Sequence, residues 1–143
     1  MESRLTDIDH VGIAVRDIDA AITWYAETLG GRVVHREDVE RDGVREAMIE
    51  VGDSFIQLLT PTRPDSPVAT FLERRGEGLH HVAYRVPNCA EALDAARAAG
   101  ARLIDETPRA GSRATTIAFL HPQTSFATLI ELVEVPRSLR TPR

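Results

Sequence analysis

The chain has 143 residues, of which 43% are hydrophobic, and it carries a formal net charge of −5 at pH 7. A chain of this length buries roughly 70% of its unfolded surface, so we expect one globular domain. The negative charge and the scattered arginines exclude a basic nucleic-acid-binding surface. No apolar run approaches the roughly 18 residues that a membrane-spanning helix needs. We therefore expect a cytoplasmic protein that binds neither nucleic acid nor membranes.

Two features of the composition limit the chemistry of the protein. The chain contains no lysine, so a Schiff base on a side-chain amine is excluded. Cys89 is the single cysteine, which excludes an internal disulfide and favours a reducing compartment. We expect a structural role for Cys89.

The chain contains an internal repeat, which is visible when residue 10 is aligned with residue 81. The stretches "HVGIAVRDIDAAITWYAETLGG" and "HVAYRVPNCAEALDAARAAGAR" each begin with strand-like alternation and continue with helical spacing. We expect Trp24 and Tyr25 of the first helix to lie in the core. The residues expected to cap the two helices are Asp17 and Asn88 at the N-terminal ends, and Gly30 and Gly100 at the C-terminal ends.

Three further strands are expected after each helix. They are "RVVHRED", "VREAMIEVG" and "SFIQLLTP" in the first half, and "ARLID", "TTIAFLH" and "ATLIELVEV" in the second. Between the halves we expect a short helix, with Ser66 as N-cap and Pro67 at the first helical position. The expected fold class is α+β: two βαβββ modules, about 8–60 and 78–135, joined by a linker helix at about 61–77 into one domain spanning 1–143. We expect their curved sheets to enclose a cleft.

Strand alternation predicts the direction of two histidines. If the apolar residues of the first strand face its helix, His10 faces the opposite side, and the repeat gives His81 the same direction. The last strand of each half carries a polar residue in an apolar stretch, Gln57 and Glu131, and both need partners if buried. Two imidazoles, an amide oxygen and a carboxylate suit a divalent transition metal, with positions left for water or substrate. The conjunction predicts a metal site in the cleft.

The other histidines have simpler explanations. His80 neighbours His81 but points the other way by alternation, so we expect it to make a structural hydrogen bond. His35 and His121 have no partner in the repeat, and we expect surface or turn positions for both.

Several stretches share their order and spacing with those of one enzyme family: "DHVGIAV", "GVREAM", "IQLLTP", "DSPVATFLERRGEGLHHVAYRV", "RLIDETPRAGS", "AFLHP" and "LIELVE". They resemble the methylmalonyl-CoA epimerases of the vicinal oxygen chelate superfamily, from about residue 8 to residue 135. The resemblance implies interconversion of the 2R and 2S epimers of methylmalonyl-CoA, the substrate, by a homodimer. It also implies a divalent metal, cobalt or else zinc, manganese or nickel, bound by His10, Gln57, His81 and Glu131.

The resemblance further implies that Glu46 of "GVREAM" transfers a proton and that Glu131 is the second acid or base. From the residues alone, an ordinary surface glutamate is the favoured interpretation of Glu46, because the surrounding run is rich in glutamate. Other functions also stay open: a glyoxalase-type isomerase acting on lactoylglutathione, a ring-cleaving dioxygenase, or a metal-free binding module.

The chain departs from its relatives in one region. It has "RATT" at 113–116 and "QTSFATL" at 123–129, where relatives usually carry glycines and a lysine; Gln123 takes the place of that lysine. An altered contact to the coenzyme or to the substrate carboxylate is one explanation.

Overall fold

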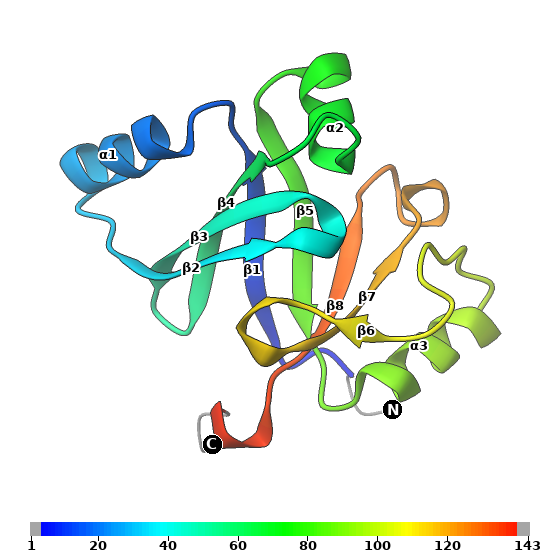
Figure 1. The fold of residues 1–143 in the computed structure, drawn as a ribbon. Helices are drawn as coiled ribbons and strands as arrows, with labels where there is room; N and C mark the ends of the chain where they lie inside the picture. The colour runs from blue at the N-terminus through cyan, green and yellow to red at the C-terminus, as the bar shows by residue number, and fades with distance from the viewer. Residues whose placement is uncertain (1–3, 140–143) are drawn as a thin grey trace. The chain divides into compact units, whose positions relative to one another are not determined.

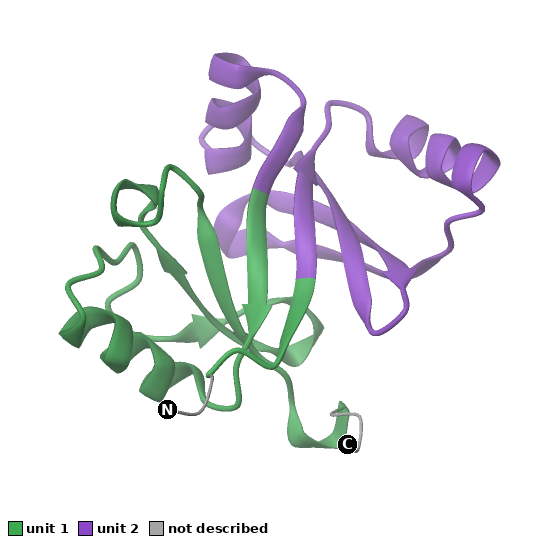
Figure 2. Cartoon of the chain, turned by 180° about the vertical axis from the view of Figure 1, so that it is seen from behind, with its two compact units in different colours: residues 1–9, 81–143 green, residues 10–80 purple. Residues whose placement is uncertain are grey.

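The computed structural model describes residues 4–139 (Figure 1). The chain divides into two compact units, one formed by residues 10–80 and the other by the described parts of residues 1–9 and 81–143 (Figure 2). Across the described residues, every helix is too short or too polar to cross a bilayer. The expected α+β class is confirmed, because one βαβββ succession follows the other along the chain.

The strands of the unit formed by residues 10–80 have the order β2-β3-β4-β1. Here β1 runs parallel to β4, whereas β2 with β3 and β3 with β4 are antiparallel. The bounds are β1 (Asp7–Ala14), β2 (Val33–Val39), β3 (Val44–Val51) and β4 (Ser54–Pro61). The last of these matches the expected strand "SFIQLLTP" residue for residue.

Two helices of this unit are α1 (Ile18–Leu29) and α2 (Pro67–Arg75). Both begin at the expected N-caps, and α1 also ends at the expected Gly30. The Asp17 carboxylate accepts a hydrogen bond from the Ala20 backbone N–H, and the Ser66 hydroxyl accepts one from Val68. Gly30 ends α1 in the left-handed conformation, with φ of 67°, which an L side chain adopts only at a cost.

The sheet of this unit buries both of its faces. On one face Val15 packs with Ile18 of α1. On the other face, Ala14 packs with Val68 and Leu72 of α2. The direction predicted for β1 is therefore confirmed: His10 lies an even number of residues from Ala14 and so is on the face opposite α1.

The second unit has the order β5-β8-β7-β6, with β5 parallel to β8 and the other pairs antiparallel. Its core on the helix side includes Leu93, which is 1% exposed, and Val86. Ala83 packs on the other face with Val133, which confirms the direction predicted for His81. The bounds are β5 (Gly78–Arg85), α3 (Cys89–Ala98), β6 (Arg109–Ala110), β7 (Thr116–Leu120) and β8 (Ile130–Glu134).

The prediction of a strand at "ARLID" is wrong. Leu103 makes only an isolated bridge to Leu120, and the edge strand beside β7 is the two-residue β6. The Asp105 carboxylate accepts a hydrogen bond from the Phe119 backbone N–H, at 2.8 Å, and pairs with Arg109. A side chain thus takes a backbone donor that a strand would have used, which is how aspartate interrupts regular pairing.

Two finer expectations about the helices also need correction. Trp24 is 53% exposed, because it lies off the apolar stripe of α1, whereas Tyr25 lies on it and packs against the core. Helix α3 ends one residue earlier than expected, with Ala99 as C-cap, and Gly100 follows with φ of 93°. Asn88 is the N-cap of α3 as expected, accepting a hydrogen bond from Glu91.

Leu93→Ala should lower the free energy of unfolding by about 3 kcal/mol, because it removes a fully buried side chain and leaves a cavity. The matched control is Leu29→Ala on α1, where the side chain is 64% exposed and the loss should stay below about 1 kcal/mol. Urea unfolding followed by circular dichroism measures both. Equal losses for the two variants would contradict the assigned core.

Candidate active site

Within the unit formed by residues 10–80, three polar side chains lie on the face opposite α1. Gln57 of β4 is opposite Gly12 of β1, and His10 is two residues before Gly12, so both side chains project from the same face. Glu46 of β3 is opposite Leu59, two residues after Gln57, and joins them on that face. His10, Gln57 and Glu46 are only 3%, 7% and 1% exposed. The sheet thus places an imidazole, an amide and a carboxylate in a buried setting.

Glu46 is held by Gln57. The Gln57 side-chain amide Nε2 donates a short hydrogen bond to Glu46 Oε2. A buried carboxylate needs such a donor, because removing its charge from water without one costs several kcal/mol. A surface position for Glu46 is therefore excluded.

The same pair keeps two oxygens free of protein donors. Among the described residues, neither Gln57 Oε1 nor Glu46 Oε1 has a hydrogen-bond partner, although both atoms are buried. Buried polar atoms of this kind usually have a hydrogen-bond partner, because a buried donor or acceptor without a hydrogen bond costs about 1–3 kcal/mol. An amide oxygen and a carboxylate oxygen are both oxygen ligands that divalent metals accept. The two oxygens are therefore candidates to bind a metal or another ligand.

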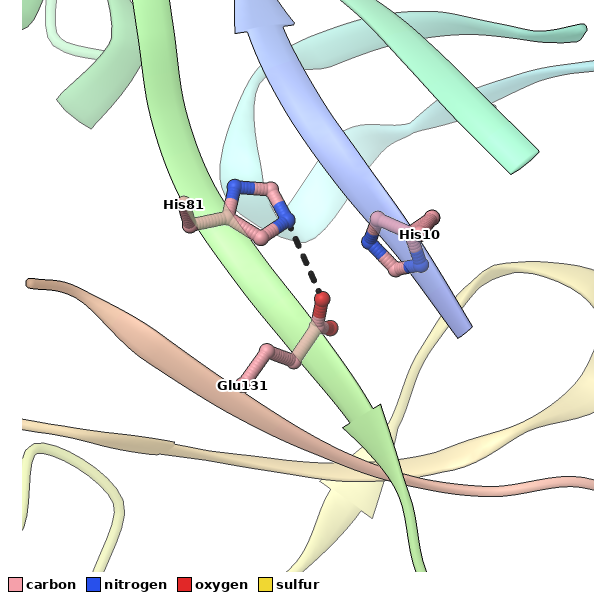
Figure 3. Close-up of side chains that lie close together, drawn as sticks. All are labelled: His10, His81 and Glu131. Carbon is pink, nitrogen blue, oxygen red and sulfur yellow. Dashed lines mark ion pairs between the residues drawn. The ribbon is translucent and has the colours of Figure 1, made fainter. Parts of the chain in front are cut away.

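In the other unit, His81 of β5 and Glu131 of β8 point toward one another (Figure 3). His81 Nε2 lies 3.2 Å from Glu131 Oε1, and both side chains are less than 10% exposed. Because Ala83 is opposite Glu131 in the parallel pair, His81 reaches the carboxylate diagonally. The Phe119 ring packs edge-on against the imidazole, with ring centroids 5.6 Å apart, and limits its rotation.

The remaining histidines lie elsewhere. His80 packs edge-on against the Phe71 ring of α2, with centroids 4.8 Å apart, which agrees with a structural role, while the hydrogen bond expected of it stays a prediction. His121 Nδ1 accepts a hydrogen bond from the Gln123 backbone N–H, which confirms a turn role. His35 Nε2 is hydrogen-bonded to Glu37 Oε1 on β2, at 2.9 Å, in a half-buried position that the sequence did not indicate.

The chain matches the Glyoxalase/Bleomycin resistance protein/Dioxygenase superfamily over residues 9–119. The chain belongs to this superfamily. It is 37% identical over 130 residues to the ethylmalonyl-CoA/methylmalonyl-CoA epimerase of Cereibacter sphaeroides, covering 90% of this chain and 97% of that one. The structure of methylmalonyl-CoA epimerase from Mycobacterium tuberculosis superposes with a TM-score of 0.92 at 41% identity, covering 97% and 94% of the two chains. A methylmalonyl-CoA epimerase structure in complex with methylmalonyl-CoA and NH4+ gives 0.91 at 41% identity, covering 96% and 99%.

One buried ion-pair cluster of this superfamily member was not indicated by the sequence. Asp9, which is 0% exposed, accepts hydrogen bonds from Arg85 at 2.7 Å and from Arg113 at 2.5 Å. Arg113 belongs to the departure "RATT" and has φ of 54°, in the left-handed region that a non-glycine residue rarely adopts. The structure therefore accounts for this part of the departure: two charge-assisted bonds hold the strand next to His10. The partners are 76 and 104 residues away from Asp9.

The second part of the departure forms an exposed turn. Gln123, in place of the usual lysine, accepts a short hydrogen bond from Arg102. Phe126 follows with φ of 57° and is 98% exposed. Nothing in the structure explains the aromatic side chain at this position.

Cys89 is a structural residue. Burial, followed by the Glu134 and Glu131 carboxylates, raises the pKa of the Cys89 thiol to about 12. The thiol therefore stays protonated, and so unreactive, up to at least pH 9. Its Sγ is within 3.9 Å of the Leu132 carbonyl oxygen.

We expect Cys89 in the folded protein to react with Ellman's reagent at pH 8 at least about a hundredfold more slowly than in urea, because only the thiolate attacks disulfides. Absorbance at the released thiolate measures both rates. Equal rates in the two conditions would show that Cys89 is neither buried nor of raised pKa.

Proposed function

We propose that this protein is a metal-dependent methylmalonyl-CoA epimerase that interconverts the 2R and 2S epimers of its substrate. The observation that carries the proposal is the buried Glu46 carboxylate, which Gln57 orients while leaving Oε1 without a donor among the described residues. A carboxylate held in this way suits proton abstraction from carbon. The similarity to epimerases over most of the chain supports the substrate.

We further propose that His10, Gln57, His81 and Glu131 bind one divalent metal ion, with cobalt, zinc, manganese and nickel as candidates. Each of the four side chains is buried, and the two imidazoles and the carboxylate are ligand types that transition metals bind. Gln57 Oε1 is buried and has no hydrogen-bond partner within residues 4–139, which is a further reason to expect a ligand there. When bound, the metal would act as a Lewis acid that stabilises negative charge on the thioester oxygen of the substrate.

The reaction requires two proton-transferring groups. The α-carbon of methylmalonyl-CoA lies between a thioester and a carboxylate, so removing its proton gives an enolate, and inversion needs the proton to return on the opposite face. We assign one face to Glu46 and the other to Glu131. The Gln57 amide fixes Glu46 through Oε2, so that Oε1 is the atom that holds the transferred proton. Burial of Glu46 keeps water from quenching the enolate.

The family resemblance also leads us to propose that the enzyme is a cytoplasmic homodimer. Size-exclusion chromatography with light scattering measures the oligomeric state directly, and a monomer at working concentration would contradict the dimer.

Adjacent histidines offer a matched pair for testing the metal ligands. His81→Ala should abolish both metal binding and epimerase activity, because a ligand is lost, whereas His80→Ala should retain the metal, because its ring packs on Phe71. Metal content by plasma mass spectrometry and the metal-induced rise in melting temperature give readouts independent of turnover.

Chelation of the wild-type enzyme should likewise abolish activity, and a divalent transition metal should restore it. Full turnover by protein verified to be free of metal would contradict the proposed metal dependence. Metal loss in His80→Ala instead of His81→Ala would show that the ligand register is wrong. Turnover of lactoylglutathione, but not of methylmalonyl-CoA, would assign the protein to the glyoxalase-type isomerases instead.

Glu46→Gln tests the base, since it preserves size and removes the charge. In deuterated water the variant should lose epimerisation by at least about a hundredfold, yet still exchange the α-proton of one epimer through Glu131 faster than it inverts that epimer. The metal should stay bound, because Glu46 is not a proposed ligand. Each epimer is supplied separately, and deuterium uptake is followed by mass and configuration by chiral analysis.

Near-normal epimerisation by Glu46→Gln would remove Glu46 from the mechanism. Equal loss of exchange for both epimers, with metal retained, would mean that one residue handles the proton on both faces.

A further inference from the structure

Three ionisable side chains form a cluster on β2 and β3. One ligand-type atom from each of His35, Glu37 and Glu46 lies within 4.8 Å of the other two. Within the cluster His35 Nε2 is hydrogen-bonded to Glu37 Oε1, at 2.9 Å. Neither His35 nor Glu37 is among the proposed metal ligands, and the reaction as described above does not use them.

The cluster runs from the interior to solvent. Glu46 is 1% exposed, whereas the side chains of His35 and Glu37 are 33% and 35% exposed. The other neighbours of Glu46 on its face of the sheet include Leu59, directly opposite, Met48, two residues along β3, and Gln57, which donates a hydrogen bond to Glu46 but is only 7% exposed. His35 and Glu37 are the partly exposed members of the cluster, so the cluster provides a polar connection from Glu46 toward water through β2.

The register of β2 against β3 places two acidic residues of this cluster opposite each other, whereas an ordinary surface pair has opposite charges. Glu37 is directly opposite Glu46 in the antiparallel ladder, and like charges at such positions destabilise a sheet. The next pair along the ladder, Asp38 with Arg45, is an ordinary exposed ion pair at 2.9 Å on the other face. The His35 imidazole is hydrogen-bonded to Glu37 beside the opposed carboxylates.

We propose that Glu37 and His35 form the route by which Glu46 exchanges its proton with solvent during epimerisation. The inference rests on the proposed function, because it assigns a task to residues beside the proposed base. A base buried to this extent holds the proton that it has removed, and each further turnover in the same direction requires that proton to leave.

The transfer balances in three steps. Protonated Glu46 passes its proton to the Glu37 carboxylate, either by a small side-chain rotation or through one bridging water. Glu37 then passes its proton to Nε2 of the neutral His35 imidazole, in the tautomer that carries its own proton on Nδ1. The imidazolium releases its Nδ1 proton to bulk water, and exchange of the ring protons with water restores the starting tautomer, so that all three groups return to their starting states. Imidazole suits the last position because histidine exchanges protons readily near neutral pH.

The test compares Glu37→Gln and His35→Gln, which keep size and hydrogen bonding but cannot carry the proton, with Asp38→Asn as the matched control on the same strand pair. Each epimer, deuterated at the α-carbon, is given separately to the metal-loaded enzyme in ordinary water. The quantity measured is the ratio of uninverted substrate that has gained solvent hydrogen to substrate that has inverted.

For the epimer whose deuteron Glu46 removes, this ratio should fall by about tenfold or more in Glu37→Gln and His35→Gln, because the deuteron returns to the same carbon before it can exchange. The ratio for the other epimer, served by Glu131, should stay as in wild type, and Asp38→Asn should change neither. Imidazole added to His35→Ala should restore the ratio, since a small base can replace the missing side chain.

A merely structural role would slow both epimers and leave both ratios unchanged, which would overturn the relay. A wild-type ratio already as low as that of the variants would overturn it as well. Should Glu37→Gln fail to fold, as judged by its melting temperature, His35→Gln and the imidazole rescue decide alone. A wild type that neither exchanges nor inverts either epimer would refute the proposed function itself, and the relay with it.

Discussion

The hydrogen bond from Gln57 to Glu46 is the interaction on which the rest of the candidate site depends. A carboxylate at 1% exposure is tolerated only with a donor, and Gln57 supplies it from the adjacent strand. Because the amide N–H donates to Glu46, the amide oxygen faces away from that carboxylate and has no hydrogen-bond partner among the described residues. One side chain therefore fixes the orientation of the proposed base and presents the proposed ligand atom.

Strand alternation made much of this predictable from the sequence. A period of two places His10 on the face opposite Val15, and the repeat extends the argument to His81 without any structure. The helix caps were equally visible, because Asp17, Asn88 and Ser66 act on backbone groups two or three residues away. Local interactions of this kind can be predicted from neighbouring residues, and the structure agrees with these predictions. The roles of these residues in metal binding and proton transfer rest on the family resemblance and on the experiments above.

Interactions between distant residues were beyond the sequence. No pattern in the sequence near Asp9 predicts its contact with Arg113, which is 104 residues away and lies in the stretch that departs from the family resemblance. The charge-assisted bonds to Asp9 hold that loop in a conformation that its own residues disfavour, with φ of 54° at Arg113. The failed strand at residues 101–105 has a similar cause, since a single carboxylate, Asp105, displaces regular pairing with β7. In both places a side chain overrides the local backbone preference.

The cluster of His35, Glu37 and Glu46 was partly predictable, because its residues are close in sequence but are brought together by a hairpin. The turn at Glu40–Asp42 closes with Gly43 at φ of 63°, which sets Val39 opposite Val44 and therefore Glu37 opposite Glu46. The pairing could be predicted from "HREDVERDGVRE" only if the length of the turn were already known. One residue more or fewer in the turn would shift the register of β2 against β3. Glu37 would then lie on the face of the sheet that Asp38 now occupies. The length of a surface turn thus determines whether the buried carboxylate has a polar connection to water.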